Sequence, residues 1–336
     1  MRILYGIQCT GNGHIKRSVA LINELRKHVR VDVLTSGANA HADLPIEVAY
    51  RLHGLCYFFG KNGSFDFWKT LTNNNLSRFF KEIKTIPLYK YDMVISDFEP
   101  VTAWAAKRNW VYSAGVSNQA TLLKKDYAKP TMISPLSKFI LRNLCPVDIS
   151  YSLSYQKLGN GYFHPPVSED IKVLSPFDGG YYVVYLPFYS KERIVKHLSQ
   201  FSSVHWKVFS KDAAKQEVYG NINVNPISNE LFNKALEGCT GVLCSAGFGL
   251  TSEALYLKKK LMVIPMKNQY EQHCNAFTLQ QIGVTVIKSL KKKHYTAINQ
   301  WLSDTKVISI QLNDEKNHLV QTILTDYVDY VNNQAV

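Results

Sequence analysis

Apolar and polar residues alternate in blocks along this chain, and the blocks predict strands and helices in turn. Residues 1–7 form an apolar run typical of a buried parallel strand, and residues 15–28 have the spacing of an amphipathic helix. Apolar runs at residues 31–35 and 93–95 predict further buried strands. A strand, a helix and a second strand in this order form a βαβ unit, so the chain begins as an α/β fold.

The second half of the chain repeats this alternation. Strands are predicted at residues 181–186, 205–209 and 242–243, with helices at residues 191–199 and 230–236. A turn at residues 245–249 leads into a helix that opens at residue 250 and ends at the basic run 258–260. A strand at residues 261–264 stops at Pro265, and a polar loop follows that ends in Glu271, Gln272 and Asn275. The last predicted helix covers residues 315–331.

The length of the chain favours two domains, because 336 residues are too many for one simple core. Residues 162–167 include Pro165 and Pro166, which stiffen the backbone and exclude a helix, so this segment is the expected linker. The predicted domains are residues 1–163 and 164–314, followed by the terminal helix in residues 315–336.

The turn at residues 245–249 is the strongest candidate for a binding site. Gly247 and Gly249 would let the backbone approach a ligand closely, and the following helix would direct its free N–H groups at an anion such as a diphosphate. Glu253, one turn into the helix, is placed to accept hydrogen bonds from paired sugar hydroxyls. The alternative is a glycine-rich strand-to-helix turn in an ordinary α/β sheet.

The first predicted strand runs into a second glycine loop, Gly11-x-Gly13-His14. It is not a complete dinucleotide fingerprint, because Lys16 stands where a third small residue is needed. No acidic residue ends the second strand, where the ribose of a dinucleotide would be held. Nicotinamide cofactors are therefore not expected.

The ordered run from residue 241 to residue 276 resembles the donor-binding segment of GT-B glycosyltransferases, in particular UDP-glycosyltransferases and the N-acetylglucosaminyltransferase of peptidoglycan synthesis. The elements that carry the resemblance are Ala246-Gly247, Thr251-Ser252-Glu253, Ile264-Pro265, Glu271-Gln272 and Asn275-Ala276. The Gly-x-Gly-His loop resembles the loop that opens the first domain of the same families. The resemblance implies a GT-B fold, with two Rossmann-like domains whose parallel sheets face each other across a cleft. It also implies that the terminal helix crosses back to the first domain.

The resemblance assigns roles to residues of the second domain, which would hold a nucleotide-diphospho-sugar, expected to be a UDP-sugar. Glu271 and Gln272 would hold hydroxyls of the donor sugar, and Asn275 would be structural. The implied donor-binding residues are Ser245, Ala246, Gly247, Phe248, Gly249, Leu250, Thr251, Glu253, Glu271 and Gln272.

In the first domain, the resemblance makes Gly11, Asn12 and Gly13 the acceptor-side loop and His14 the general base that deprotonates an acceptor hydroxyl. A histidine suits this task because its pKa lies near the operating pH. The alternative for His14 is a capping or steric role at the start of a helix. Asp97, expected at the carboxyl end of its strand, is the candidate to orient His14, and its alternative is to cap the helix near residue 101. Glu99 is the second candidate for that orienting role and the rival base.

Two absences in the sequence bear on the reaction. Retaining GT-B enzymes often carry a glutamate eight positions before the helix glutamate, where this chain has Ser245, so an inverting reaction is expected. The chain has no Asp-x-Asp motif and no metal-ligand spacing of acidic residues. We therefore expect no metal and no cofactor, with the leaving diphosphate stabilised by the turn and helix dipole.

The chain carries a net charge of +13, with basic groups at residues 124–125, 258–260 and 291–294. No nucleic-acid-binding module accompanies them. Aromatic residues mixed with basic ones at residues 57–68 and 79–81 suggest a surface for a membrane-bound or lipid-linked acceptor, as in cell-surface glycan or glycolipid synthesis. The alternative is aromatic core packing beside a solvated basic face.

The remaining features favour a soluble enzyme. No apolar run is long enough to span a bilayer, the N-terminus is strand-like, and the six scattered cysteines are expected to be reduced thiols. A cytoplasmic glycosyltransferase of the hexosyltransferase type is expected, with peripheral membrane association as a hypothesis. Two alternatives stay open: an enzyme like UDP-N-acetylglucosamine 2-epimerase, and a sugar- or nucleotide-binding protein without turnover.

Overall fold

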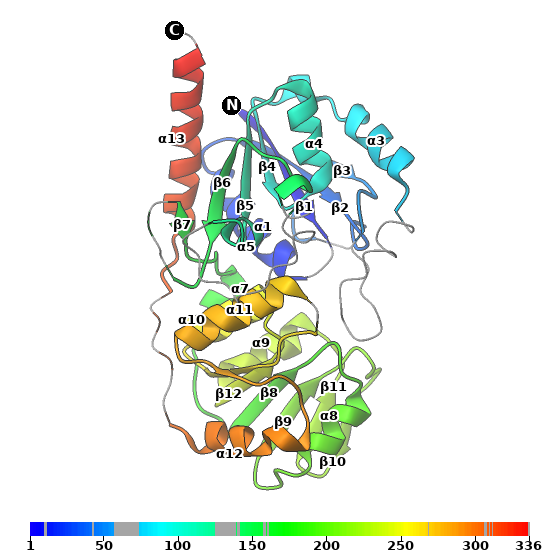
Figure 1. Ribbon diagram of the computed structural model, residues 1–336, viewed down its shortest axis with the longest axis vertical. Coiled ribbons are helices and arrows are strands. Elements are labelled where there is room, and N and C mark those ends of the chain that lie inside the picture. The colour runs from blue at the N-terminus through cyan, green and yellow to red at the C-terminus, as the bar shows by residue number, and fades with distance from the viewer. Residues whose placement is uncertain are drawn as a thin grey trace.

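The computed structural model describes residues 1–9, 12–41, 44–56, 74–124, 139, 142–156, 159, 161–267, 269–305, 308, 310 and 312–334. Two lobes lie one above the other along the longest axis of the molecule, and each is built on a β-sheet (Figure 1). Within the described residues, each sheet has seven strands, and the fold is the α/β arrangement expected from the sequence.

The first sheet has the strand order β3-β2-β1-β4-β5-β6-β7, with every pairing parallel. Its strands are β1 (Arg2–Gln8), β2 (Arg30–Ser36), β3 (Tyr50–Arg51), β4 (Met93–Asp97), β5 (Ser113–Ser117), β6 (Ile149–Leu153) and β7 (Tyr162–Phe163). The first two residues of the expected linker therefore form a short strand of the sheet, because they pair with β6 before the prolines begin.

The second sheet has the order β10-β11-β9-β8-β12-β13-β14 and is parallel except for the antiparallel pair β10–β11. Its strands are β8 (Tyr181–Tyr185), β9 (His205–Phe209), β10 (Glu217–Tyr219), β11 (Ile222–Asn225), β12 (Gly241–Cys244), β13 (Lys260–Val263) and β14 (Thr285–Val286).

Helices cover both faces of each sheet. The helices are α1 (Asn12–Leu25), α3 (Leu76–Thr85), α4 (Pro100–Asn109), α5 (Asn118–Thr121), α7 (Glu169–Lys172), α8 (Lys191–Leu198), α9 (Asn229–Gly238), α10 (Phe248–Tyr256), α11 (Tyr270–Gln281), α12 (Tyr295–Ser303) and α13 (Lys316–Gln334), with short 3₁₀ turns at Leu88–Lys90 and Lys292–His294. In the first lobe, α1 and α13 pack on one face of the sheet, and α3 and α4 pack on the other. In the second lobe, α8 and α12 cover one face, while α9, α10 and α11 cover the other.

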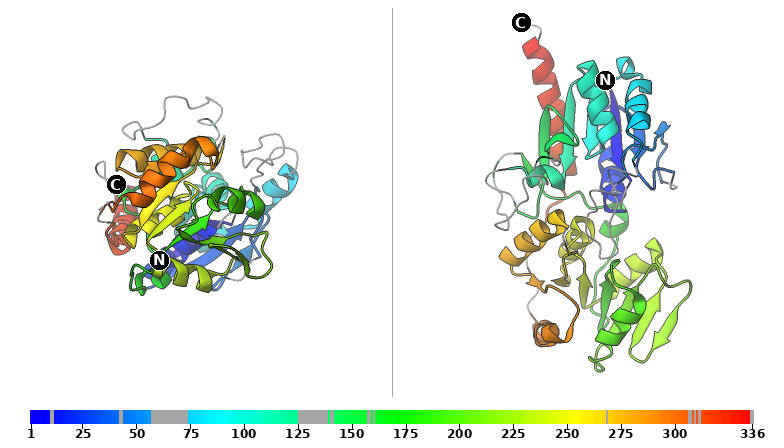
Figure 2. Two further views of the ribbon diagram at one scale, coloured as in Figure 1. Left: turned by 90° about the horizontal axis from the view of Figure 1, so that it is seen from below. Right: turned by 45° about the vertical axis from the view of Figure 1, so that its right-hand side comes forward.

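The terminal helix α13 belongs to the first lobe in space although it ends the chain. It runs beside β6 and α1, far from the second sheet (Figures 1 and 2). Leu319, Val320 and Ile323 are buried in the same apolar cluster as β1, and the Tyr151 hydroxyl donates a 2.6 Å hydrogen bond to Asp326. The helix thus ties the end of the chain to the first domain.

The parallel topology determines where a ligand would bind. In an open parallel sheet, binding sites form at the carboxyl ends of the strands. The carboxyl ends of β1, β4 and β5 lie at the lower edge of the first sheet, toward α10 and α11 of the second lobe (Figure 1). No helix within the described ranges is both long and apolar enough to cross a membrane.

Candidate functional site

His14 and Asp97 meet at the carboxyl edge of the first sheet. His14 lies in the first turn of α1, and Asp97 is the last residue of β4. The His14 Nδ1 atom is 3.1 Å from Asp97 Oδ1. Asp97 is fully buried, whereas 17 % of the His14 side chain is exposed. The contact that the sequence analysis considered is therefore present, with the imidazole accessible and the carboxylate behind it.

Arg17 and Ser18, which the sequence analysis did not select, complete this cluster. Arg17 Nε donates to Asp97 Oδ2 at 2.8 Å, and Arg17 Nη2 donates to Oδ1. The Ser18 hydroxyl also donates to Oδ2 at 2.8 Å. Residues three and four positions apart share one face of a helix, so the spacing from His14 to Arg17 and Ser18 was an available signal.

The Asp97 carboxylate is held in its charged form. Burial alone would raise the pKa of Asp97, but the charge of Arg17, followed by the interactions with His14, outweighs burial and lowers the pKa well below its usual range. The carboxylate is therefore ionised at any pH at which the protein would work. It presents a permanent hydrogen-bond acceptor to the imidazole.

Gln119 and Arg17 are the two neighbours of the His14 ring that bear on its tautomer. Its amide Nε2 donates to Glu271 Oε2 at 3.0 Å and lies 3.5 Å from His14 Nε2. The bond to Glu271 fixes the amide nitrogen as the group that faces the imidazole, which leaves His14 Nε2 as an acceptor. In that tautomer the Nδ1–H group donates to Asp97. Arg17 Nη2, which can only donate, lies 2.8 Å from the same Nδ1 and favours the other tautomer, so Asp97 and Arg17 compete for this nitrogen.

Glu99 occupies the capping role that was considered for Asp97. Its carboxylate accepts hydrogen bonds from the Val101 and Thr102 backbone N–H groups at the start of α4, and from the Ser36 hydroxyl at 2.6 Å. Glu99 is fully buried, and both its oxygens are engaged. Burial raises the pKa of Glu99, and these hydrogen bonds oppose the rise. The geometry therefore gives Glu99 a structural position and leaves His14 as the accessible basic group.

The glycine turn of the second domain forms the start of α10, two residues earlier than predicted. Gly247 is the N-cap residue, no side chain caps the helix, and its first turn has no acidic residue. In contrast, Glu99 caps α4 and Ser228 caps α9. The N–H groups at the start of α10 are therefore available to an anion.

The starts of α1 and α10 contact each other across the domain boundary. A Cβ atom placed on Gly249 would lie 3.2 Å from the Cα atom of Gly13. A side chain at position 249 would therefore require a small shift, whereas a Cβ atom on Gly13 would lie at an ordinary contact distance, 3.8 Å from the Gly249 Cα atom. The predicted acceptor-side loop is shorter than expected, because α1 already begins at Asn12; Gly11 lies outside the described residues.

The other predicted donor residues differ in accessibility. Ser245, Ala246, Phe248 and Thr251 are buried, whereas Gly247, Gly249, Leu250 and Glu253 are partly exposed. The Thr251 hydroxyl lies 2.6 Å from the Tyr155 hydroxyl, so this threonine joins the two domains.

Glu253 faces the first domain. Its Oε1 atom is 3.5 Å from the Lys16 ammonium, which also lies 3.6 Å from Asp170. Burial raises the pKa of Glu253, and Lys16 partly offsets that rise. Lys16, the residue that breaks the dinucleotide fingerprint, thus pairs with the helix glutamate of the opposite domain.

The polar segment predicted as a loop is instead the first half of α11. Glu271 is near the start of this helix and reaches Gln119. The Gln272 side chain accepts a hydrogen bond from the Met266 backbone N–H, and Asn275 donates to the Ala246 carbonyl. Gln272 is 7 % exposed, so in this arrangement it supports the preceding loop, while Glu271 faces the domain boundary.

Among the described residues, no group of three or more histidine, cysteine, aspartate or glutamate side chains is arranged to hold a metal ion. The features that could bind a ligand here are the uncapped start of α10 and the side chains of His14, Glu253 and Glu271.

Comparisons with known proteins agree with this geometry. A family model described as "Glycosyl transferase family 1" matches residues 1–305. The glycosyltransferase SsfS6 of Streptomyces sp. SF2575 has a similar structure, with a TM-score of 0.62 and 15% identity over 96% of this chain and 99% of that one. The structure of S. aureus MnaA with UDP gives a TM-score of 0.60 and 12% identity, covering 98% and 97% of the two chains. SsfS6 has also been solved in complex with thymidine diphosphate. Among curated proteins, no significant sequence match was found.

Proposed function

We propose that this chain, which belongs to glycosyl transferase family 1, transfers a sugar from a nucleotide-diphospho-sugar to a hydroxyl acceptor with inversion of configuration. The observation that carries the proposal is the meeting of two helix starts from different domains. The start of α1 presents the accessible His14 imidazole, and the start of α10 offers uncapped N–H groups. A base and an anion-binding group on either side of one boundary are the two parts that such a transfer needs.

The second domain would bind the donor. The diphosphate would accept hydrogen bonds from the α10 N–H groups, Glu253 would hold paired hydroxyls of the nucleotide ribose, and Glu271 would hold the donor sugar. UDP is the nucleotide we propose first, and dTDP second, because similar structures contain UDP or thymidine diphosphate. Transfer of a hexose is part of the same proposal.

The chemical step would use His14 as the general base. Its Nε2 atom would take the proton of the acceptor hydroxyl while the oxygen attacks the anomeric carbon. The bond from that carbon to the diphosphate oxygen breaks, and the nucleoside diphosphate leaves with the electron pair. Asp97 would stabilise the imidazolium that forms, and the positive end of α10 would stabilise the leaving diphosphate without a required metal.

The epimerase alternative would need further carboxylates for acid–base chemistry in the cleft. Both candidates of the sequence analysis have other partners, since Asp97 is bound to Arg17 and Glu99 caps α4. This supports the transferase over the epimerase. Incubation with UDP-N-acetylglucosamine and no acceptor separates the two, because an epimerase would form the 2-epimer and a transferase would not.

The proposed binding site can be tested by thermal stability in the presence of UDP, GDP, dTDP, CMP or NAD. A ligand at about a hundred times its Kd stabilises the folded state by roughly 2.7 kcal/mol, which raises the Tm by several degrees. We expect UDP or dTDP to stabilise the protein. At the same nucleotide concentration the Glu253→Ala variant should lose about half of this stabilisation, as a tenfold higher Kd implies. Stabilisation by NAD alone, or by none of the nucleotides, would refute the donor site. A binder without turnover would respond to UDP but release none from a UDP-sugar.

We also propose a cytoplasmic location, with the membrane as the place where a lipid-linked acceptor would be met. The aromatic residues at positions 57–68 that suggested this lie outside the described residues. In the second suggested segment Phe79 is buried and Phe80 is exposed. The basic run at residues 258–260 is not a surface patch, because Lys259 and Lys260 are buried. Membrane association therefore depends on the first segment and stays a hypothesis.

A further inference from the structure

A pocket of about 750 Å³ lies in the first domain, on the face of the sheet that carries α4. Small residues of three neighbouring strands line it, Ser96 of β4, Gly115 of β5 and Ser150 of β6. Leu123, Phe139 and Val147 contribute apolar walls. Val147 packs over Gly115, since a Cβ atom at position 115 would lie 3.0 Å from a Val147 methyl group.

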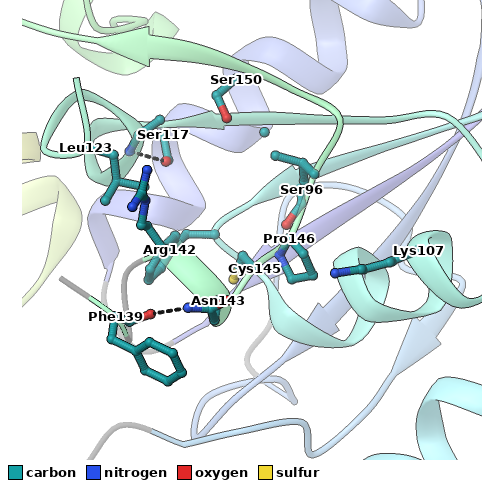
Figure 3. A pocket seen from close by; sticks show the side chains of 14 residues that line it. Ser96, Lys107, Ser117, Leu123, Phe139, Arg142, Asn143, Cys145, Pro146 and Ser150 are labelled. Atoms are coloured by element: carbon teal, nitrogen blue, oxygen red, sulfur yellow. Dashed lines mark hydrogen bonds between the residues drawn. The ribbon is translucent and has the colours of Figure 1, made fainter. Parts of the chain in front are cut away.

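Two cationic side chains also line the pocket, Lys107 of α4 and Arg142. Figure 3 shows Arg142 on the side of Ser117 and Lys107 on the opposite side, with its ammonium directed toward Pro146. Arg142 is exposed and makes no ion pair within the described part of the chain, and the Lys107 ammonium lies 5.3 Å from the Trp104 ring. No acidic side chain belongs to the described lining.

Two buried carboxylates lie close enough to act on the pocket, since Glu99 and Asp97 add to the effect of burial in raising the pKa of the Cys145 thiol, but each is partly offset by its own partners. Asp97 is paired with Arg17, and the Glu99 carboxylate is bound by the N–H groups of α4. The Ser117 hydroxyl accepts a hydrogen bond from the Ala120 N–H, which leaves its own proton to be donated. The lining thus combines apolar walls with cationic and hydroxyl donors, a set that suits an anionic group on an apolar body.

We propose that this pocket binds an amphiphilic acceptor through an anionic group, a phosphate or a carboxylate, held by Arg142 and Lys107. The proposal rests on the glycosyltransferase function proposed above and gives the class of its acceptor. Successive residues of a strand point to opposite faces of a sheet, so Ser96 lines the pocket on the α4 face while Asp97 meets His14 on the α1 face. The pocket and the His14 cluster therefore share only the carboxyl edge of the sheet. An acceptor anchored in the pocket would have to extend around this edge to reach His14.

Cys145 provides a reporter that does not depend on activity. It lines the pocket and is partly exposed, whereas the other five cysteines are at most 5 % exposed. Burial raises the pKa of the Cys145 thiol, so alkylation by iodoacetamide would be slow and is best followed at about pH 9 by mass spectrometry. A ligand in the pocket should slow this reaction in proportion to its occupancy.

The experiment compares four probes by their protection of Cys145: octyl phosphate, octanoate, octyl glucoside and inorganic phosphate. We expect octyl phosphate or octanoate to protect the thiol, and the stronger of the two identifies the anionic group. The Arg142→Gln variant should raise the apparent Kd at least about fivefold, and Arg142→Lys should recover part of the affinity. Arg108→Gln is the matched control, because Arg108 is exposed on α4 next to Lys107 but is absent from the lining.

Several results would overturn the proposal. Equal protection by octyl glucoside would show that binding does not need an anionic group. Equal protection by inorganic phosphate would show that binding does not need an apolar chain. If Arg108→Gln lost as much affinity as Arg142→Gln, the effect of Arg142 would be one of general surface charge and not of a specific contact. The substituted side chains are exposed, so the variants should keep the wild-type Tm.

The outcome can be separated from that of the proposed function. Stabilisation by UDP tests the proposed donor site of the second domain. Protection of Cys145 tests the pocket of the first domain and needs no nucleotide. Loss of the UDP effect with protection retained would refute the donor site and leave the pocket in place. The reverse result would refute the pocket alone.

Discussion

Replacing Asp97 with asparagine tests whether the buried cluster behind His14 is an ion pair that the fold depends on. The substitution keeps the size of the side chain and removes its charge. In the wild type, the carboxylate accepts two hydrogen bonds from Arg17 and one from Ser18, and it faces the His14 ring nitrogen. The variant would leave the Arg17 guanidinium, which is 7 % exposed, without its counter-ion.

The cost follows from that stranded charge. Removing one partner of a buried ion pair costs about 3–5 kcal/mol, because the remaining charge stays desolvated. For a domain of this size, 1 kcal/mol shifts the Tm by roughly 2–4 °C, so we expect a decrease of about 10 °C. The double variant Asp97→Asn/Arg17→Met removes both charges and should recover at least about 2 kcal/mol. Activity should stay low in the double variant, since His14 lacks its carboxylate in both.

The measurement is the free energy of unfolding from denaturant titration, with hydrogen exchange of the β4 amides to assign the loss to the first domain. The pH dependence provides a second check. The pKa of Asp97 is lowered in the folded state, so its contribution is present above the unfolded-state pKa of about 3.9 and is lost as the pH falls through the lower folded-state pKa. The stability difference between wild type and Asp97→Asn should therefore be constant near neutral pH and shrink in acid. A difference under about 1 kcal/mol at pH 7 would refute the ion-pair reasoning.

Three further predictions concern the reaction itself. His14→Ala should lower the rate of nucleoside diphosphate release about 10²- to 10⁴-fold and leave the stabilisation by UDP unchanged. A rate within a factor of about ten of wild type would show that His14 is not the general base. Glu253→Ala should raise the Kd for UDP, measured by calorimetry, about tenfold, and the Kd of Glu253→Gln should lie between those of wild type and Glu253→Ala. Equal UDP affinities of wild type and Glu253→Ala would contradict the ribose contact. Gln119→Ala removes a side chain that competes with the donor sugar for Glu271, so it should lower the Kd for the donor by up to about fivefold. A higher Kd in this variant would show that Gln119 itself contacts the donor.

The two-domain α/β fold could be predicted because most of its strands are buried on both faces. Such strands appear as apolar runs in the sequence, as in β1, β4 and β8. The short strands β3, β7 and β14 have two residues each, too few to show a pattern. The start of α11 was missed for a related reason, because no side chain caps it and its first turn is polar.

The candidate site could be predicted only where a single segment carries the information. His14 and the glycine turn were found in this way, and Asp97 followed from its position at the end of a strand. Arg17 lies one helical turn after His14, but that spacing alone does not reveal its partner Asp97, which lies 80 residues away, and the partner of Gln119 lies 152 residues away. Side chains that meet across the sheet edge or the domain boundary leave no local pattern, so their roles require the three-dimensional arrangement.

The contacts across the domain boundary bear on how a donor would enter. Glu253 is paired with Lys16, and Glu271 with Gln119, so each proposed donor carboxylate is already bound to the opposite domain. A nucleotide-sugar that uses these carboxylates must exchange both contacts, and each is worth roughly 0.5–1.5 kcal/mol net. The contact of Gly13 with Gly249 also closes the space between the two helix starts. If the proposed carboxylates hold the donor, its binding would be coupled to a separation of the domains at this point, and closure around the donor would bring His14 back toward the reacting carbon.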